Sequence, residues 1–153
     1  MDILFTLLTV ILGHFTGAYL FYFFHRYIFH GPLGRYPILK RWKAVHTRHH
    51  ASPNDPGAFF FPWWANAMIW TMAIISALVI PAFGLGMVSF FCLYAYRHKT
   101  SHMGSNARYS IHHMNHHINH SVSNFSGPYP AIDMLFGTYR PAPIKIITRS
   151  DKS

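Results

Sequence analysis

The sequence predicts an all-α integral membrane protein with one membrane span, a helical hairpin and a helical, histidine-rich cytoplasmic cap. Composition is the first reason, because 51% of the residues are hydrophobic and only 11% are charged, whereas soluble domains carry about 25% charged residues. The second reason is that all 13 Lys and Arg lie outside three long apolar stretches. The third is that nearly all of the 13 histidines also lie outside them. The length of 153 residues suits a single domain, 1–153.

The first apolar stretch runs from Ile3 to Phe24 without a charged residue. A helix of about 22 residues is roughly 33 Å long, which is enough to cross a hydrocarbon core of about 30 Å. A cleaved signal peptide is the alternative, but it needs a basic segment in front and a small-residue cleavage site. The stretch instead ends in aromatic residues, which suit a membrane interface. We therefore predict a retained span at about 3–24.

The second apolar block extends from Trp63 to Tyr96 and contains no charged residue. Pro81 divides it, which predicts a helical hairpin of roughly Trp63–Ile80 and Ala82–Tyr96, with spans at about 63–80 and 82–96. The second arm is short, so we expect it to tilt or to continue into the polar segment that follows. A buried hairpin of a soluble protein is the alternative.

The remaining segments, 25–62 and 97–140 with a tail at 141–153, hold every Lys and Arg. One span followed by a hairpin places both segments on the same side of the membrane, and the positive-inside rule makes that side cytoplasmic. We expect a multi-pass protein, with the bacterial inner membrane favoured over the endoplasmic reticulum because the short chain shows no retention signal. The net charge of +9 is explained by this pattern, so we expect no nucleic-acid partner.

Twelve histidines lie in these polar segments, in four clusters at 25–30, 46–50, 98–102 and 112–120. Residues three and four apart share a helix face, so His46, His49 and His50 should converge, and so should His98 and His102. The fourth cluster repeats the spacing of the second. A disordered metal-binding tract could account for the fourth cluster alone, but not for four clusters next to predicted membrane boundaries. The spacing therefore predicts that each cluster offers several imidazoles to one metal.

The number of histidines also bears on the metal. Neutral imidazole binds Fe, Zn, Cu and Ni, and coordination selects the neutral form, which removes the repulsion among crowded imidazolium ions. Ten to twelve ligands fit two metals better than one, since a closed tetrahedral zinc site needs only four. All-nitrogen ligation with open positions suits iron that activates dioxygen. Spacing alone leaves zinc and nickel open.

The order of the clusters resembles the fatty acid hydroxylase superfamily, which includes sterol desaturases and related membrane histidine-box oxygenases. Its pattern is similar to H-x(3,4)-H, H-x(2,3)-H-H, H-x(3)-H and a second H-x(2,3)-H-H, followed by an Asn-aromatic-Gly element and W-D-x-x-F-G-T. The segments 124–127 and 132–140 resemble the last two elements, although Ile132 replaces the Trp and Ser126 separates Phe125 from Gly127. One span precedes the first cluster where the family commonly has a hairpin, which makes a homo-oligomer an open alternative.

The resemblance covers about residues 20–140, and it implies the metal ligands residue by residue. The implied ligands are His25, His30, His46, His49, His50, His98, His102, His113, His116 and His117. His112 and His120 share a stripe with His116, so each remains open as a further ligand, a hydrogen-bond partner of a ligand or a proton carrier.

The resemblance also implies the function: a di-iron oxygenase that hydroxylates a lipid-like substrate with dioxygen, two iron ions (zinc can replace iron in a purified sample) and an external electron donor. The chain has no nucleotide-binding motif such as G-x-G-x-x-G, and its cationic cap suits an acidic ferredoxin or cytochrome. We expect no catalytic residue beyond the metal centre and no other cofactor site. A desaturase or carotenoid hydroxylase with the same centre is one alternative, and a non-enzymatic membrane metal carrier or sensor is another.

Two further interpretations concern residues outside the histidine clusters. We interpret the aromatic residues Phe59, Phe60, Phe61, Trp63 and Trp64 as membrane anchors rather than substrate contacts. We interpret Asp133 and Arg140 as residues that close the cap structurally, without a role in catalysis.

Overall fold

The computed structural model describes residues 2–119 and 122–142, and within them the chain is helical and contains no strand. Short π and 3₁₀ segments, labelled η, connect the α-helices. In chain order the elements are α1 (Ile3–Phe23), η1 (Phe24–Phe29), η2 (Pro32–Arg35), α2 (Pro37–Ala51), η3 (Pro56–Ala58), α3 (Trp63–Val79), α4 (Pro81–His102), α5 (Arg108–Asn119) and α6 (Pro130–Leu135). The all-α class is confirmed.

The helix ends follow from simple sequence signals. Asp2 caps α1 by accepting a hydrogen bond from the Leu4 amide, as expected for a carboxylate at a helix start. Three α-helices begin with proline, at Pro37, Pro81 and Pro130, because proline has no N–H to leave unpaired and its φ already suits the first helical position.

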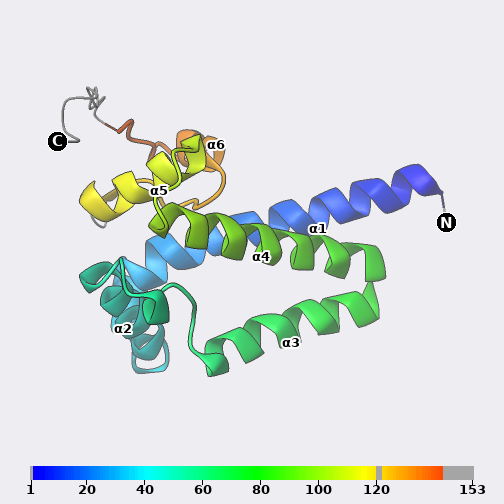
Figure 1. Ribbon diagram of the computed structural model, residues 1–153. Helices are drawn as coiled ribbons and strands as arrows, with labels where there is room; N and C mark the ends of the chain where they lie inside the picture. Colours follow the sequence, from blue (N-terminus) through cyan, green and yellow to red (C-terminus); the bar gives the residue numbers. More distant parts are fainter. Residues whose placement is uncertain (1, 120–121, 143–153) are drawn as a thin grey trace.

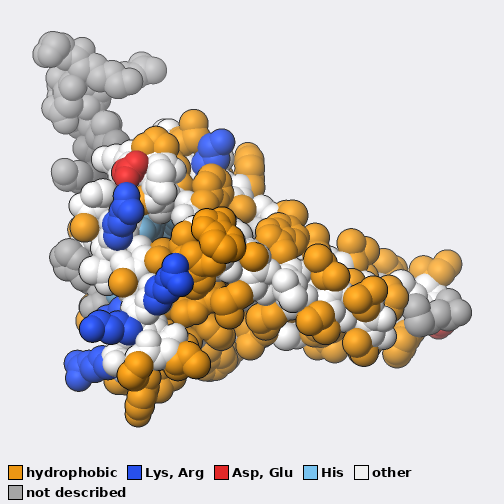
Figure 2. All heavy atoms as spheres, turned by 90° about the horizontal axis from the view of Figure 1, so that it is seen from below, with side chains coloured by type: hydrophobic (Ala, Val, Ile, Leu, Met, Phe, Trp, Pro, Cys, Tyr) orange, Lys and Arg blue, Asp and Glu red, His pale blue; other side chains and the backbone are white. Residues whose placement is uncertain are grey.

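The long helices α1, α3 and α4 extend away from a broader end formed by α2, α5 and α6 (Figure 1). The chain enters α1 at the narrow end, returns there along α3 and comes back to the broad end along α4. This arrangement agrees with a single long helix followed by a hairpin. Figure 2 shows hydrophobic side chains along the narrow part and Lys and Arg side chains at the broad end.

Two stretches are long and apolar enough to cross a membrane, Ile3–Phe29 and Pro56–Val79. In the most apolar part of each stretch, only 17% and 11% of the residues are buried. This disagrees with the alternative of a soluble hairpin, whose helices would be covered by protein. Among the described residues α4 does not meet the same criterion. The predicted arm 82–96 is part of a longer helix, Pro81–His102, that continues into the polar segment and ends in Lys99 and His102.

The helices α1 and α4 approach each other closely because glycines face the contact. A Cβ atom at Gly13 would lie 2.1 Å from the Phe83 carbonyl oxygen, and one at Gly86 would lie 2.1 Å from the Val10 carbonyl oxygen. Small residues permit this backbone-to-backbone approach between apolar helices. The contact matters for function because α1 continues directly into the π segment that carries His25, and α4 ends in His98 and His102. It therefore fixes the position of one set of imidazoles relative to the other.

Candidate metal centre

A π-helical turn brings the first two candidate ligands to the same side of the chain. His25 and His30 are five residues apart, and in an α-helix they would point in different directions. The chain changes to a π-helix at η1, where each N–H bonds the carbonyl five residues earlier, and the His30 amide accordingly bonds the His25 carbonyl at 3.1 Å. Regular α-helix ends at Phe23, and the π-helix runs from Phe24 to Phe29. The π turn therefore supplies the pairing that an α-helix would not.

The ten predicted histidines come together in two groups of five at the broad end of the molecule. The candidate ligand nitrogens within each group all lie within 4.8 Å of one another. The first histidine group consists of His25, His30, His46, His50 and His116. The second histidine group consists of His49, His98, His102, His113 and His117.

The grouping corrects one expectation from spacing. We expected each cluster to serve one metal, but α2 and α5 each divide their histidines between the two groups. His46 and His50 belong to the first group and His49 to the second, whereas α5 gives His116 to the first group and a pair to the second. Residues four apart differ by about 40° around an α-helix and residues three apart by about 60° in the opposite sense. Pairs four apart therefore stay together, and the intervening histidine points to the neighbouring group.

The spacing of the nitrogen atoms suits a bound cation. Neighbouring Nε2 atoms lie 2.8–3.1 Å apart in the first group and 2.9–3.2 Å apart in the second. Imidazole nitrogens about 2.1 Å from a divalent ion such as zinc, with neighbouring ligands at right angles, would be ~3.0 Å apart. Hydrogen bonding alone cannot explain so many contacts, because a neutral imidazole has only one N–H.

The surroundings keep these imidazoles neutral. Burial lowers the pKa of His46, and the neighbouring imidazoles of the first group lower it further. The pKa of His113 in the second group is lowered in the same way, first by burial and then by its neighbours. Burial is also the main cause that lowers the pKa values of His49 and His116. Neutral imidazole is the form that binds metal ions, so the fold selects the competent state near neutral pH.

The first group is also oriented by backbone carbonyls of a single loop. Nδ1 of His25 donates to the Phe125 carbonyl at 2.6 Å, and Nδ1 of His116 donates to the Ser123 carbonyl at 2.8 Å. A protonated Nδ1 leaves the Nε2 lone pair free in the neutral ring. Both rings therefore direct an electron pair into the first group, which is the arrangement of a metal ligand.

A model of the fatty acid hydroxylase family matches residues 10–138. The chain belongs to this family. Comparisons with curated proteins and with solved structures find no match. Membership implies an oxidoreductase, and the histidine groups together with the two apolar helices fit a membrane oxygenase of the histidine-box type. The resemblance predicted from the histidine clusters is confirmed.

One further histidine of this fatty acid hydroxylase, His112, stands apart from both groups. Nε2 of His112 lies 3.0 Å from Oδ2 of Asp133, so this ring supports the cap, and the described candidate metal groups do not include it. His120 lies outside the described residues. Asp133 has no exposed surface and bonds only groups of the cap, in agreement with a structural role. The Arg140 carbonyl accepts from Asn124, which ties the same loop.

An apolar cavity of about 330 Å³ lies beside the histidine groups, between α1, α3 and α4. Its walls are Phe21, Phe59, Phe60, Phe61, Asn66, Ile69, Trp70, Phe91, Tyr94 and Ala95. A smaller pocket shares four of these residues, Phe59–Phe61 and Tyr94, and is lined on its other side by His46, His49 and His98. The cavity is therefore separated from imidazoles of both groups by a thin aromatic layer.

The aromatic layer corrects part of our interpretation of 59–64. Phe59 is buried and packs against the His102 ring, with centroids 5.1 Å apart, so it is not a membrane anchor. Trp63, in contrast, is 81% exposed, as an anchor would be. Tyr94 was not singled out from the sequence, although its ring stacks on His98 with centroids 5.3 Å apart. Its position four residues before His98 was the only available signal.

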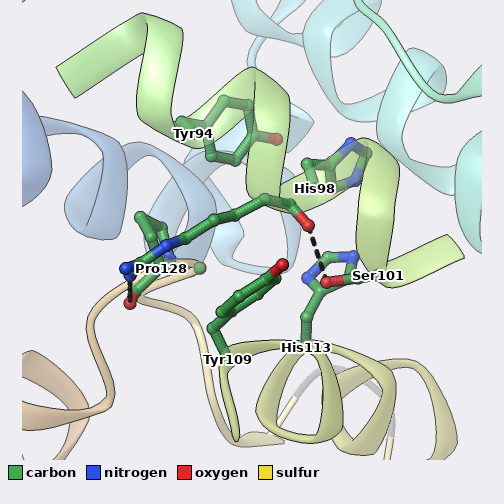
Figure 3. A pocket seen from close by; sticks show the side chains of 8 residues that line it. Tyr94, His98, Ser101, Tyr109, His113 and Pro128 are labelled. Atoms are coloured by element: carbon green, nitrogen blue, oxygen red, sulfur yellow. Dashed lines mark hydrogen bonds between the residues drawn. The ribbon is translucent and has the colours of Figure 1, made fainter. Parts of the chain in front are cut away.

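A third, small pocket also has Tyr94 in its wall. Figure 3 shows Tyr94 and His98 of α4 facing Tyr109 and His113 of α5. Its volume of about 10 Å³ is roughly that needed for one water molecule. Tyr94 therefore lines three spaces, one apolar and two next to candidate ligands.

Proposed function

We propose that this fatty acid hydroxylase is a di-iron membrane oxygenase that hydroxylates a lipid-like substrate, such as a fatty acyl or sterol chain, with dioxygen and external electrons. The observation that carries the proposal is the apolar cavity, which shares Phe59–Phe61 and Tyr94 with a smaller pocket lined by imidazoles of both groups. A metal store or sensor has no use for such a cavity, whereas an enzyme that oxidises a C–H bond needs one.

The ligand set favours iron at both positions. Five imidazoles exceed the four ligands of a closed tetrahedral zinc site and leave one position of a six-coordinate ion open. Two iron ions held by the first and second histidine groups would supply the activation of dioxygen. Zinc can occupy the same nitrogens in a purified sample, because imidazole binds both metals.

The residues of the cavity bind and align the substrate chain. Walls of Phe, Ile and Trp side chains exclude water and favour a hydrocarbon by the ordinary hydrophobic effect. Tyr94 packs on Phe21, with centroids 4.3 Å apart, and stacks on His98, so it holds a fixed position between the cavity and the imidazoles. A carbon of the bound chain that reaches this aromatic layer is the one presented for oxidation.

The placement of charge supports the topology and the source of electrons. With α1, α3 and the apolar part of α4 in the bilayer, the basic broad end of the molecule lies on the cytoplasmic side under the positive-inside rule (Figure 2). A cationic cap attracts an acidic redox carrier, such as a ferredoxin or a cytochrome. The polar head of the substrate would remain at the same interface.

A desaturase and a membrane metal carrier are the two alternatives to this function. Loss of a second hydrogen in the same site would yield a double bond, so a desaturase differs only in its product. A membrane metal carrier would need ligands along its spans. The one histidine in α1, His14, instead bonds the hydroxyls of Ser89 at 2.6 Å and Tyr129 at 2.5 Å, which occupies both of its nitrogens.

The test begins with metal analysis and Mössbauer spectroscopy on the full chain, purified in detergent from cells grown with ⁵⁷Fe. We expect two irons per chain, and oxygen consumption when reductant and lipid extract are added. Lipid profiles of cells with and without the protein should then differ by a hydroxylated species. A new double bond would select the desaturase, and metal binding without any lipid change would contradict the oxygenase proposal.

Ligand variants provide the matched comparison. His49→Ala and His116→Ala each remove a nitrogen from a different group, so we expect both to lose metal and activity together. His14→Ala removes a histidine outside both groups and should retain two metals per chain. Retention of two metals by either ligand variant would count against the assignment of these residues.

A further inference from the structure

The two histidine groups differ in the hydrogen bonds that their Nδ1 atoms make. In the first group, His25 and His116 donate to two carbonyls of the same loop, 123–126, at 2.6 and 2.8 Å. In the second group, Nδ1 has no hydrogen-bond partner among the described residues in four of the five rings. These rings are His49, His98, His102 and His117. Carbonyl groups of Ala58 and Phe59 approach the first two of them without completing a hydrogen bond.

The loop behind the first group depends on one carboxylate. Oδ1 of Asp133 accepts from the Phe125 amide at 2.8 Å and from the Thr138 hydroxyl at 2.7 Å. Oδ2 accepts from the Ser126 amide at 2.9 Å and from the Ser126 hydroxyl, and it also faces His112. Burial would raise the pKa of Asp133, but these hydrogen bonds outweigh it and lower the pKa. Asp133 is therefore an ionised acceptor that holds the backbone amides of two consecutive residues, Phe125 and Ser126.

The loop would not keep this shape unaided. Asn124 has a φ of +58°, a left-handed conformation that asparagine tolerates better than most residues but that still benefits from surrounding contacts. The hydrogen bonds from Phe125 and Ser126 to Asp133, called the clamp below, supply such contacts. Asn124 lies between Ser123 and Phe125, the two residues whose carbonyls hold His116 and His25, so the clamp and the ring orientations are coupled through three consecutive residues.

We propose that Asp133 is a positioning residue that makes the two metal positions unequal: by clamping the 123–126 loop it orients His25 and His116, so the first group retains its metal more tightly than the second. The inference rests on the proposed metal centre. Loss of an orienting hydrogen-bond partner typically costs about 10–100-fold in metal affinity. We expect the two metals to differ in release rate by about tenfold or more for the same reason.

The test loads the detergent-purified full chain with Co²⁺, adds EDTA and measures the metal retained over time by mass spectrometry. The wild type should release cobalt in two phases of one ion each. His102→Ala removes a ligand of the second group and should abolish the fast phase alone. Asp133→Asn keeps the size of the side chain but replaces one acceptor oxygen by a donor, so the slow phase should accelerate about tenfold or more while the fast phase stays unchanged.

Two further variants separate positioning from general destabilisation. Ser126→Ala removes one donor to Asp133 and leaves both backbone amides bonded, so it should give an intermediate slow phase even if the Asn variant does not accumulate. Tyr22→Phe removes a 3.0 Å contact with the Thr138 hydroxyl without touching the carboxylate, and both phases should persist.

The outcomes are distinct. A single release phase in the wild type, or equal effects of Ser126→Ala and Tyr22→Phe on the slow phase, would overturn the inference and leave the metal centre standing. Failure of the wild type to bind two ions would instead overturn the proposed function on which the inference rests.

Discussion

Without the metals that we propose, this protein should be acutely sensitive to mild acid. Burial, reinforced by neighbouring imidazoles, lowers the pKa values of His49 and His116 to about 3 in the folded chain, against about 6.5 in an unfolded one. Between these values the unfolded state binds protons and the folded state does not. The free energy of unfolding is therefore fully present above pH 6.5 and is lost as the pH falls toward 3.

The size of the effect follows from the same two pKa values. On acidification from pH 7 to pH 5, each such histidine should lower the free energy of unfolding by about 2 kcal/mol. His49 and His116 together then account for about 4 kcal/mol, a large share of the 5–15 kcal/mol typical of a folded domain. Bound metal keeps the imidazoles neutral in the folded state, so the metal-loaded protein should resist acid until protons displace the ions.

Thermal unfolding in detergent between pH 8 and pH 5 measures this directly. We expect the Tm of the metal-free protein to be nearly constant above pH 7 and to fall steeply below pH 6.5, and that of the loaded protein to change less. The double variant His49→Gln and His116→Gln removes two titrating groups. In the metal-free protein, the slope of the free energy of unfolding against pH should therefore decrease by about 2.7 kcal/mol per pH unit. A flat Tm in the metal-free wild type would refute the reasoning, as would a slope that the double variant leaves unchanged.

Two further predictions concern the helices that carry the site. Gly86→Ala places a Cβ atom 2.1 Å from a carbonyl oxygen of α1, so α1 and α4 must separate, at a cost of about 1–3 kcal/mol. We expect a lower Tm than for Leu85→Ala, a variant at a neighbouring residue that is 59% exposed, and similar values would contradict the close contact. Ile69→Trp should fill the apolar cavity and reduce product formation on long chains without metal loss. Leu78→Trp, on an exposed part of the same helix, should leave the product yield unchanged.

The long helices and the set of ten histidines that forms the two groups could be predicted because both depend on local pattern. An apolar run with no charge indicates a span whatever it packs against, and α3 begins at the predicted Trp63. The ten histidines were identified from spacing and order, and all ten lie in one group or the other. Which histidine joins which group could not be predicted from spacing alone. It depends on how α2 and α5 are rotated about their axes, and tertiary packing decides that rotation.

The π turn and the carbonyls that accept from His25 and His116 could not be predicted from the sequence for a different reason. A five-residue separation of His25 and His30 indicates only that an α-helix would not pair them. Loss of helical structure near His30 was an equally compatible arrangement. Backbone carbonyls carry no sequence signature at all. From the sequence, only the family resemblance around Asp133 pointed to this loop. The hydrogen bonds that hold the loop could not be predicted, because the five donors to Asp133 come from residues brought together by the fold.

The arrangement of pairs and single histidines has a mechanical consequence for the whole centre. Each group contains two pairs from single helical segments and one histidine from a segment whose own pair belongs to the other group. In the first group the single is His116 of α5, and in the second it is His49 of α2. Because a helix moves as a rigid unit, neither α2 nor α5 can shift relative to one group without displacing a nitrogen of the other group. The two positions are thus coupled through these helices, while the loop clamped by Asp133 acts on one of them alone.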